Sequence, residues 1–188
     1  MAKSDDNVVM KGMTGIIGDM LVFKNRAGQT VVSKIPKFKE NRVATAKQQL
    51  VQDRFAMACF YAKAAINNPD TKEAYQAAAE RGQSAYNVAF ADFFNAPIIV
   101  SITKESYTGA VGSNLSIRAK DDYKVTRIKV SIRAADDTLI EEGDAAAPVD
   151  TLEWEYAATV ANPLVAGSKI KVTAYDLPGN ETSLEVVL

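Results

Sequence analysis

The hydrophobic periodicity of the chain changes at Pro97, and this change constrains the fold more than any other feature of the sequence. Before Pro97, apolar residues such as Val51 and Phe55 recur with the spacing of an amphipathic helix. After Pro97, apolar and polar residues alternate over short segments, which is typical of β-strands. The sequence therefore predicts an α+β chain with two domains, residues 1–96 and residues 97–188.

The first domain is predicted to contain a β-hairpin and three alanine-rich helices. Strands over residues 20–23 and 29–35 flank a turn in which Gly28 can supply a positive φ. Helices are expected over residues 45–66, over residues 71–81 with Asp70 or Thr71 as the N-cap, and from Ser84 to a point before Pro97.

A hairpin of only two strands is marginally stable alone and is stabilised by pairing with another sheet or another copy of the chain. The sequence therefore predicts that the apolar residues of this hairpin pair or pack across an interface. These candidate interface residues are Leu21, Val22, Phe23, Val31 and Val32.

The second domain is predicted to be a two-sheet β-sandwich. Six or seven short strands, each with one apolar face, fit into about ninety residues. In the first of them, Ile98, Val100 and Ile102 are expected on the apolar face. Trp154 alternates with Glu153 and Glu155, so we interpret it as a core residue rather than a ligand platform.

The charge is balanced overall but uneven along the chain. There are 22 Lys and Arg against 23 Asp and Glu, which argues against a protein that binds nucleic acid over its whole surface. Residues 1–50 carry a net charge of +5, whereas residues 97–188 carry −5. Opposite charges at the two ends favour head-to-tail assembly of copies, although solvated faces also differ in charge by chance.

The sequence lacks the residues of the common catalytic sites, so we predict no enzyme activity and no cofactor. There is no histidine, which excludes His-assisted triads and His-ligated metals, and the single cysteine, Cys59, excludes an intramolecular disulfide. An oxygen-ligand metalloenzyme remains an alternative. Asp121, Asp122 and Asp176 lie at strand ends that meet at one end of a sandwich, where they are candidates for binding Ca²⁺. Such residues are also common in ordinary turns.

A second function class is nucleic-acid binding through the basic hairpin. Lysine and arginine side chains there can contact phosphates, but they also protect the edges of an exposed hairpin from aggregation. The candidate residues are Lys24, Arg26, Lys34, Lys37, Lys39 and Arg42.

The N-terminal residues do not have the pattern of a secretory signal peptide, and the apolar runs are shorter than a membrane span requires. We therefore expect synthesis in the cytoplasm, and a final location either in the cytoplasm or in a particle such as a virion.

Two stretches of the chain carry resemblances to known proteins. The first resemblance is to a family of uncharacterised bacterial proteins, and it covers residues 15–36, which begin Gly-Ile-Ile-Gly, and the helix from Gln48 to Phe60. Ser33 stands where the pattern of that family often has Arg. The stretch from Ala174 to Asn180 resembles the last hairpin of bacterial immunoglobulin-like modules. The first resemblance implies no activity, and the second implies an immunoglobulin-like sandwich.

Taken with the missing catalytic residues, these features predict a non-enzymatic structural or interaction subunit. We expect it to form homo-oligomers, as in a filament, tube, shell or phage-type particle, with other structural proteins as further partners.

Overall fold

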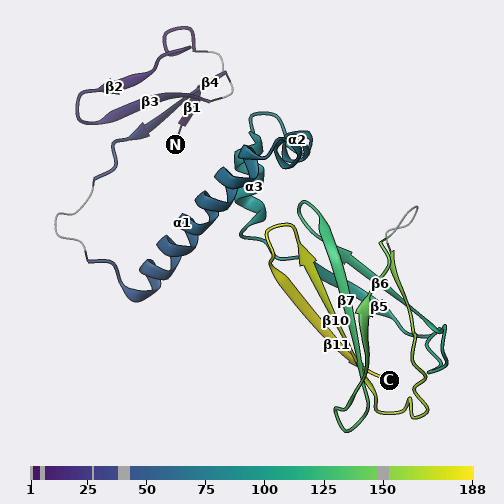
Figure 1. Ribbon diagram of the computed structural model, residues 1–188. Helices are drawn as coiled ribbons and strands as arrows, with labels where there is room; N and C mark the ends of the chain where they lie inside the picture. The colour runs from purple at the N-terminus through teal and green to yellow at the C-terminus, as the bar shows by residue number, and fades with distance from the viewer. Residues whose placement is uncertain (1, 5–6, 27, 38–42, 148–152) are drawn as a thin grey trace.

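A computed structural model describes residues 2–4, 7–26, 28–37, 43–147 and 153–188. In these ranges the chain forms three helices and eleven strands, a mixed α+β fold that is mostly β. Figure 1 shows an N-terminal sheet at one end, the helices in the middle and two C-terminal sheets at the other end. None of the helices in these ranges has both the length and the apolar character needed to cross a membrane.

The N-terminal sheet contains the predicted hairpin and two strands that the sequence analysis does not predict. The hairpin pairs β3 (Leu21–Arg26) with β4 (Gln29–Lys34), and Gly28 in its turn has φ 85°. The short strands β1 (Ala2–Ser4) and β2 (Gly15–Ile17) flank it, in the order β1-β4-β3-β2. The prediction of only two strands is therefore wrong, because three-residue strands carry too little alternation to be recognised.

The three predicted helices are present, with a corrected boundary for the second. Helix α1 (Ala46–Asn67) begins with a capping box between Thr45 and Gln48. Helix α2 (Pro69–Ala77) is capped by the side chain of Asn68, not by Asp70 or Thr71. It begins two residues earlier and ends four residues earlier than expected. Pro69 starts it because the first turn of a helix needs no backbone donor. Helix α3 (Ala85–Asp92) is capped by Ser84, as predicted.

The helices pack through small side chains around one buried aromatic ring. Tyr75 of α2 is fully buried and lies in one apolar cluster with alanines of α1 and α3. Small residues allow the helix axes to approach closely, and partly buried apolar side chains such as Tyr61, Ile66 and Phe90 pack around this contact. The alanines of the cluster are Ala62, Ala65, Ala85 and Ala89.

The residues after Pro97 form two antiparallel sheets. One has the order β5-β6-β9, from β5 (Ile98–Thr103), β6 (Asn114–Lys120) and β9 (Glu153–Ala157). The other has the order β11-β10-β7-β8, from β7 (Val125–Arg133), β8 (Leu139–Asp144), β10 (Lys169–Asp176) and β11 (Glu181–Val187). The period of two that begins at Pro97 thus corresponds to strands.

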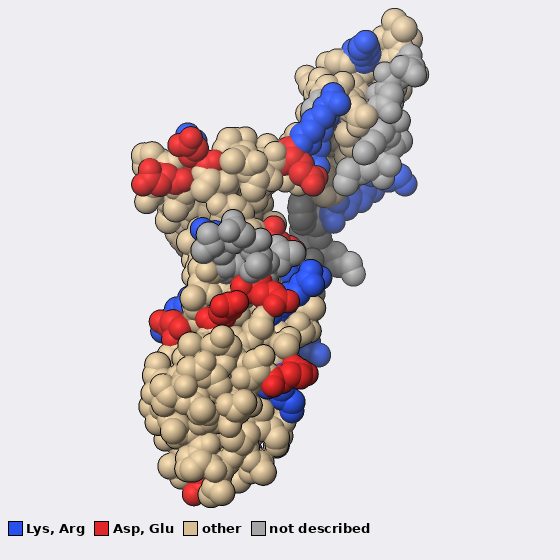
Figure 2. Space-filling model, turned by 90° about the vertical axis from the view of Figure 1, so that its right-hand side faces the viewer, with Lys and Arg blue, Asp and Glu red and all other residues tan. Residues whose placement is uncertain are grey.

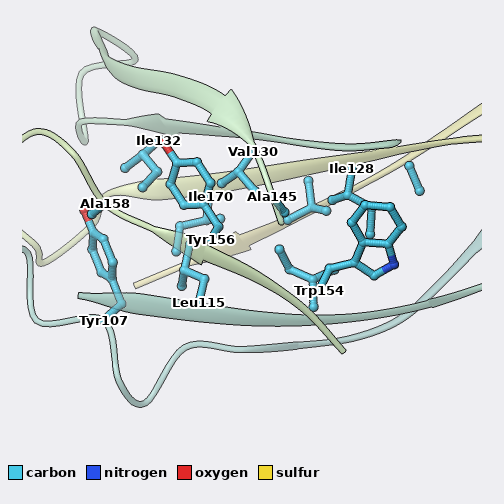
Figure 3. Packing of buried hydrophobic residues seen from close by; sticks show 13 residues of the cluster. Tyr107, Leu115, Ile128, Val130, Ile132, Ala145, Trp154, Tyr156, Ala158 and Ile170 are labelled. Carbon is cyan, nitrogen blue, oxygen red and sulfur yellow. The ribbon is translucent and has the colours of Figure 1, made fainter. Parts of the chain in front are cut away.

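Both sheets contribute to a single core. Ile128, Val130 and Ile132 of β7 are fully buried, and so is Leu115 of β6. Figure 3 shows these side chains pointing toward one another together with Trp154, which is buried as predicted.

The first strand of this region differs from the prediction. Ile98 and Val100 are more than half exposed, whereas Ile99 and Ile102 pack against the core. The pairing of β5 with β6 shifts between Ile99 and Ser101. One extra residue at such a bulge reverses the faces on either side of it, so strict alternation fails here.

Candidate functional site

The predicted interface residues of the hairpin differ in exposure. Phe23 and Val31 are buried, with 5% and 7% of their surface exposed, so their side chains already pack within this chain. Val22 and Val32 are half-buried, and only Leu21 is exposed. The sequence pattern does not separate these cases, because alternation along β3 and β4 does not say which side chains other segments cover. One such segment lies near Thr30, whose Oγ1 accepts a hydrogen bond from Gly12 N at 3.1 Å.

The exposed apolar surface of the N-terminal sheet lies instead at its β2 edge. Ile16 and Ile17 of β2 and the adjacent Met20 are at least half exposed, and Leu21 borders them. An edge strand with exposed isoleucines has unpaired backbone groups beside apolar side chains, which is the usual template for pairing with another strand.

The first half of α1 is a second exposed apolar surface. Every described residue from 49 to 57 is exposed, and only later residues, beginning with Ala58, are buried. Leu50, Met57 and Phe60 fall at positions i, i+7 and i+10, which places them along one face of the helix. We call these three residues the outer strip of α1. They are 69%, 62% and 72% exposed.

The described basic candidates lie on both faces of the N-terminal sheet. Lys24 and Arg26 alternate along β3 on one face, whereas Lys34 is paired with Leu21 on the other face. Lys37 is exposed beyond β4, and Lys39 and Arg42 lie outside the described residues. Figure 2 shows blue side chains at several separate places on this sheet. The described residues therefore do not form a single basic face.

Two of the three calcium candidates come together, but with a different third carboxylate. Asp121 follows β6 and Asp176 ends β10, and both lie beside Asp92, the last residue of α3. The ligand oxygens of these three residues lie within 4.8 Å of one another. Asp122 does not belong to this group, and its carboxylate accepts a hydrogen bond from Asn95 Nδ2 at 2.7 Å. We call Asp92, Asp121 and Asp176 the acidic junction.

Hydrogen bonds hold each carboxylate of the acidic junction in place. Asp92 Oδ2 accepts from the hydroxyl of Tyr75 at 2.6 Å, and Asp121 Oδ2 accepts from the backbone of Lys124 at 3.1 Å. Asp176 Oδ1 accepts from the backbone N–H groups of residues 179 and 180 at 2.8 and 2.6 Å. Asp92 Oδ1 and Asp121 Oδ1 are buried and have no hydrogen-bond partner among the residues that the structure describes.

The surroundings of Asp92 make its charged form costly. Burial raises the pKa of Asp92 to about 6, and the nearby charges of Asp121 and Asp176 act in the same direction. The hydrogen bond from Tyr75 opposes this rise. Burial also raises the pKa of Asp121.

The turn between β10 and β11 joins the C-terminal sheets to the end of α3. Asn180 Nδ2 donates to Asp176 Oδ2 at 2.7 Å, and it lies 3.3–3.4 Å from the carbonyl oxygens of Asp92, Phe93 and Asn95. The rings of Tyr75 and Tyr123 add a contact, with centroids 4.4 Å apart. The acidic junction therefore lies within a packed contact between helices and sheets.

Sequence reasoning misses Asp92 because a single acid in a helix is normally a solvated residue. One signal was present: Asp92 lies in the last turn expected before Pro97, and a carboxylate is unfavourable at the C-terminal end of a helix dipole.

No protein-family model matches this chain, and no curated protein matches it. Among solved structures, a crystal structure of an engineered protein is 15% identical, with a TM-score of 0.35. The similar region covers 57% of this chain and 28% of that chain. The function is therefore argued from the residues of the chain itself.

Proposed function

We propose that this protein is a non-enzymatic structural subunit that self-associates, and that the outer strip of α1 contacts a second copy of the chain. The observation that carries this proposal is the exposure of Leu50, Met57 and Phe60 along one face of α1. The contacts of the first half of this helix with α3 are made by other residues, Arg54 and Phe55. Burying one such side chain contributes about 1.5–3 kcal/mol, so covering the strip is strongly favourable.

The charge distribution supports a second copy as the partner. Residues 1–50 carry a net charge of +5 and residues 97–188 carry −5, so the N-terminal end of one copy attracts the C-terminal end of another. Contacts between unlike ends are heterologous, and they generate rings or filaments rather than closed two-fold dimers. The β2 edge, with Ile16 and Ile17 exposed, offers a strand-pairing surface for the same purpose.

We propose an immunoglobulin-like class for the two C-terminal sheets. The sheet orders β5-β6-β9 and β11-β10-β7-β8 support it, because they correspond to the A-B-E and G-F-C-C′ order of that class. In this proposal, the C-terminal unit lies on the outside of the assembly. Such a subunit would serve in an assembly such as a filament, tube, shell or phage-type particle.

The test is light scattering after size exclusion, with negative-stain microscopy of the same fractions. Leu50→Glu combined with Met57→Glu places two charges on the outer strip and should reduce the assembly to monomers. The matched control combines Gln52→Glu with Lys63→Gln, which changes the net charge by the same amount at exposed positions on another side of the helix from Leu50 and Met57. The control should assemble like the wild type.

A wild-type protein that is monomeric at low and high salt would overturn the proposal, and so would normal assembly of the Leu50→Glu, Met57→Glu variant.

Nucleic-acid binding is the alternative, and the exposure of Lys24, Arg26, Lys34 and Lys37 favours it. It predicts retention on DNA or RNA that falls steeply with salt and is abolished by charge reversal at Lys34 and Lys37. Self-association predicts that this double variant is retained no differently from the wild type.

A further inference from the structure

The acidic junction brings three carboxylates together, and no lysine or arginine of the described residues forms an ion pair with them. Asp92, Asp121 and Asp176 come from three separate segments of the chain. The ion pairs found among the described residues all lie elsewhere, on β7, β8, β10 and the turn between β7 and β8. Three negative charges within a few ångströms repel one another strongly where water is excluded.

The hydrogen bonds of the junction leave two oxygens free. Asp92 is only 2% exposed, yet its Oδ1 has no hydrogen-bond partner. Asp121 Oδ1 is likewise buried and unpartnered. An unpaired buried acceptor is costly, and for a charged group the cost is larger still. These two oxygens are therefore available to a positively charged ligand.

We propose that Asp92, Asp121 and Asp176 bind a Ca²⁺ ion that joins the end of α3 to the C-terminal sheets. Calcium takes oxygen ligands at about 2.3–2.6 Å in flexible geometry, so two ligands on opposite sides of one ion are about 4.8 Å apart. The three ligand oxygens lie within 4.8 Å of one another, so a single ion can contact all of them.

The remaining ligands come from water. Calcium takes about six to eight oxygens, and the junction supplies three carboxylates. Asp92 also lines an open surface hollow of about 330 Å³ together with Asp122 and Tyr123. This hollow gives an ion and its waters a path to Asp92. Smaller Mg²⁺ demands near-ideal octahedral geometry at shorter distances, which fits three ligands fixed by separate elements less well.

The C-terminal end of α3 adds to the attraction for a cation. Asp92 is the last residue of this helix, where the helix dipole is negative. Its carboxylate is therefore unfavourable there without a cation, and a bound ion offsets both the dipole and the repulsion among the three acids.

The experiment is calcium titration of the full chain after treatment with a chelator and removal of the chelator. Isothermal titration calorimetry should show one saturable site per chain, and calcium should raise the melting temperature. Terbium provides a second measurement, because tyrosines beside the site sensitise its luminescence and calcium should displace it. Tyr75, which bonds to Asp92, and Tyr123, which packs on Tyr75, are the expected sensitisers.

Three substitutions locate the site. Asp92→Asn and Asp121→Asn each remove one ligand charge and should lower calcium affinity by at least about tenfold, because affinity follows the charge of the ligands. Asp122→Asn is the matched control: it removes a neighbouring acid that lines the hollow but lies outside the junction, so it should lower calcium affinity much less than Asp92→Asn or Asp121→Asn. Thermal melting in chelator shows whether each variant is folded. If Asp92→Asn does not fold, Asp121→Asn, which changes a half-buried position, tests calcium binding at the junction in its place.

Several results would overturn the proposal. The first is a wild-type protein with no binding heat, no thermal shift and no terbium signal, which would leave a shared proton as the explanation of the cluster. The second is unchanged affinity in Asp92→Asn or Asp121→Asn. The third is a loss in Asp122→Asn as large as in these variants. Tighter binding of magnesium than of calcium would overturn the assignment of the ion.

Discussion

Tyr75→Phe should destabilise the protein more than Tyr61→Phe, although both remove one hydroxyl. The Tyr75 hydroxyl lies 2.6 Å from Asp92 Oδ2 and 2.7 Å from the hydroxyl of Tyr61. Phenylalanine at position 75 keeps the ring packed but leaves Asp92 with no hydrogen-bond donor at either oxygen. Losing a hydrogen bond to a buried charged group costs about 1.5–3 kcal/mol, whereas losing a neutral one costs about 0.5–1.5 kcal/mol.

The assay is urea unfolding of the wild type and both variants in chelator, with the slope checked to be the same in all three. The penalty for Tyr75→Phe should also depend on pH. The Tyr75 hydroxyl favours ionised Asp92, whose pKa in the folded protein is about 6. Its contribution is therefore present above this pKa and decreases as the pH falls through it. Equal penalties for the two variants, or a Tyr75→Phe penalty that does not change with pH, would refute this reasoning.

Three further predictions concern stability. In urea unfolding, Gly109→Ala should lower the unfolding free energy several times more than Gly112→Ala. Both glycines have positive φ, but a Cβ at Gly109 would lie 2.4 Å from a backbone carbonyl oxygen, whereas a Cβ at Gly112 meets open space. Equal losses of unfolding free energy would contradict this packing. Leu115→Ala should lower the unfolding free energy by about 2–5 kcal/mol. Leu164→Ala, at a position 78% exposed, should change it by less than about 0.5 kcal/mol. Similar values for the two variants would argue against the two-sheet core. In chelator, the unfolding free energy should fall as the pH rises from about 4 to above 6. The reason is that Asp92 binds its proton more tightly in the folded protein, where its pKa is about 6, than in the unfolded chain. Asp92→Asn should flatten this pH profile, and a wild-type profile that rises over the same range would contradict the prediction.

Most of the C-terminal strands were predictable because one face of the strand is buried. A residue such as Val130 is fully buried while its neighbour Lys129 reaches solvent, so alternation in the sequence reproduces alternation in space. The prediction fails at β5, where the bulge near Val100 changes the face without leaving a signal in the composition. It fails again at β1 and β2, which owe their existence to pairing with the hairpin rather than to their own pattern.

The acidic junction was predictable only in part. Asp121 and Asp176 follow from topology, because the ends of neighbouring strands meet at one end of a two-sheet unit. Asp92 depends on how the helices dock against that end, and docking is determined by contacts such as Tyr75 with Tyr123, which link segments far apart in the sequence. Local periodicity contains no information on such pairs.

The junction also connects the two proposed functions of the molecule. Asn180 holds the end of α3, and α3 in turn holds α1: the rings of Phe55 and Phe90 lie 5.0 Å apart, and Arg54 donates to the carbonyl of Phe94 at 3.1 Å. The direction in which the outer strip of α1 faces, relative to the C-terminal sheets, is therefore determined through the junction. A cation bound there would stiffen this path without touching the strip. If bound calcium favours the orientation of α1 that assembles, assembly must in turn tighten calcium binding by the same factor, because coupling between two sites is reciprocal.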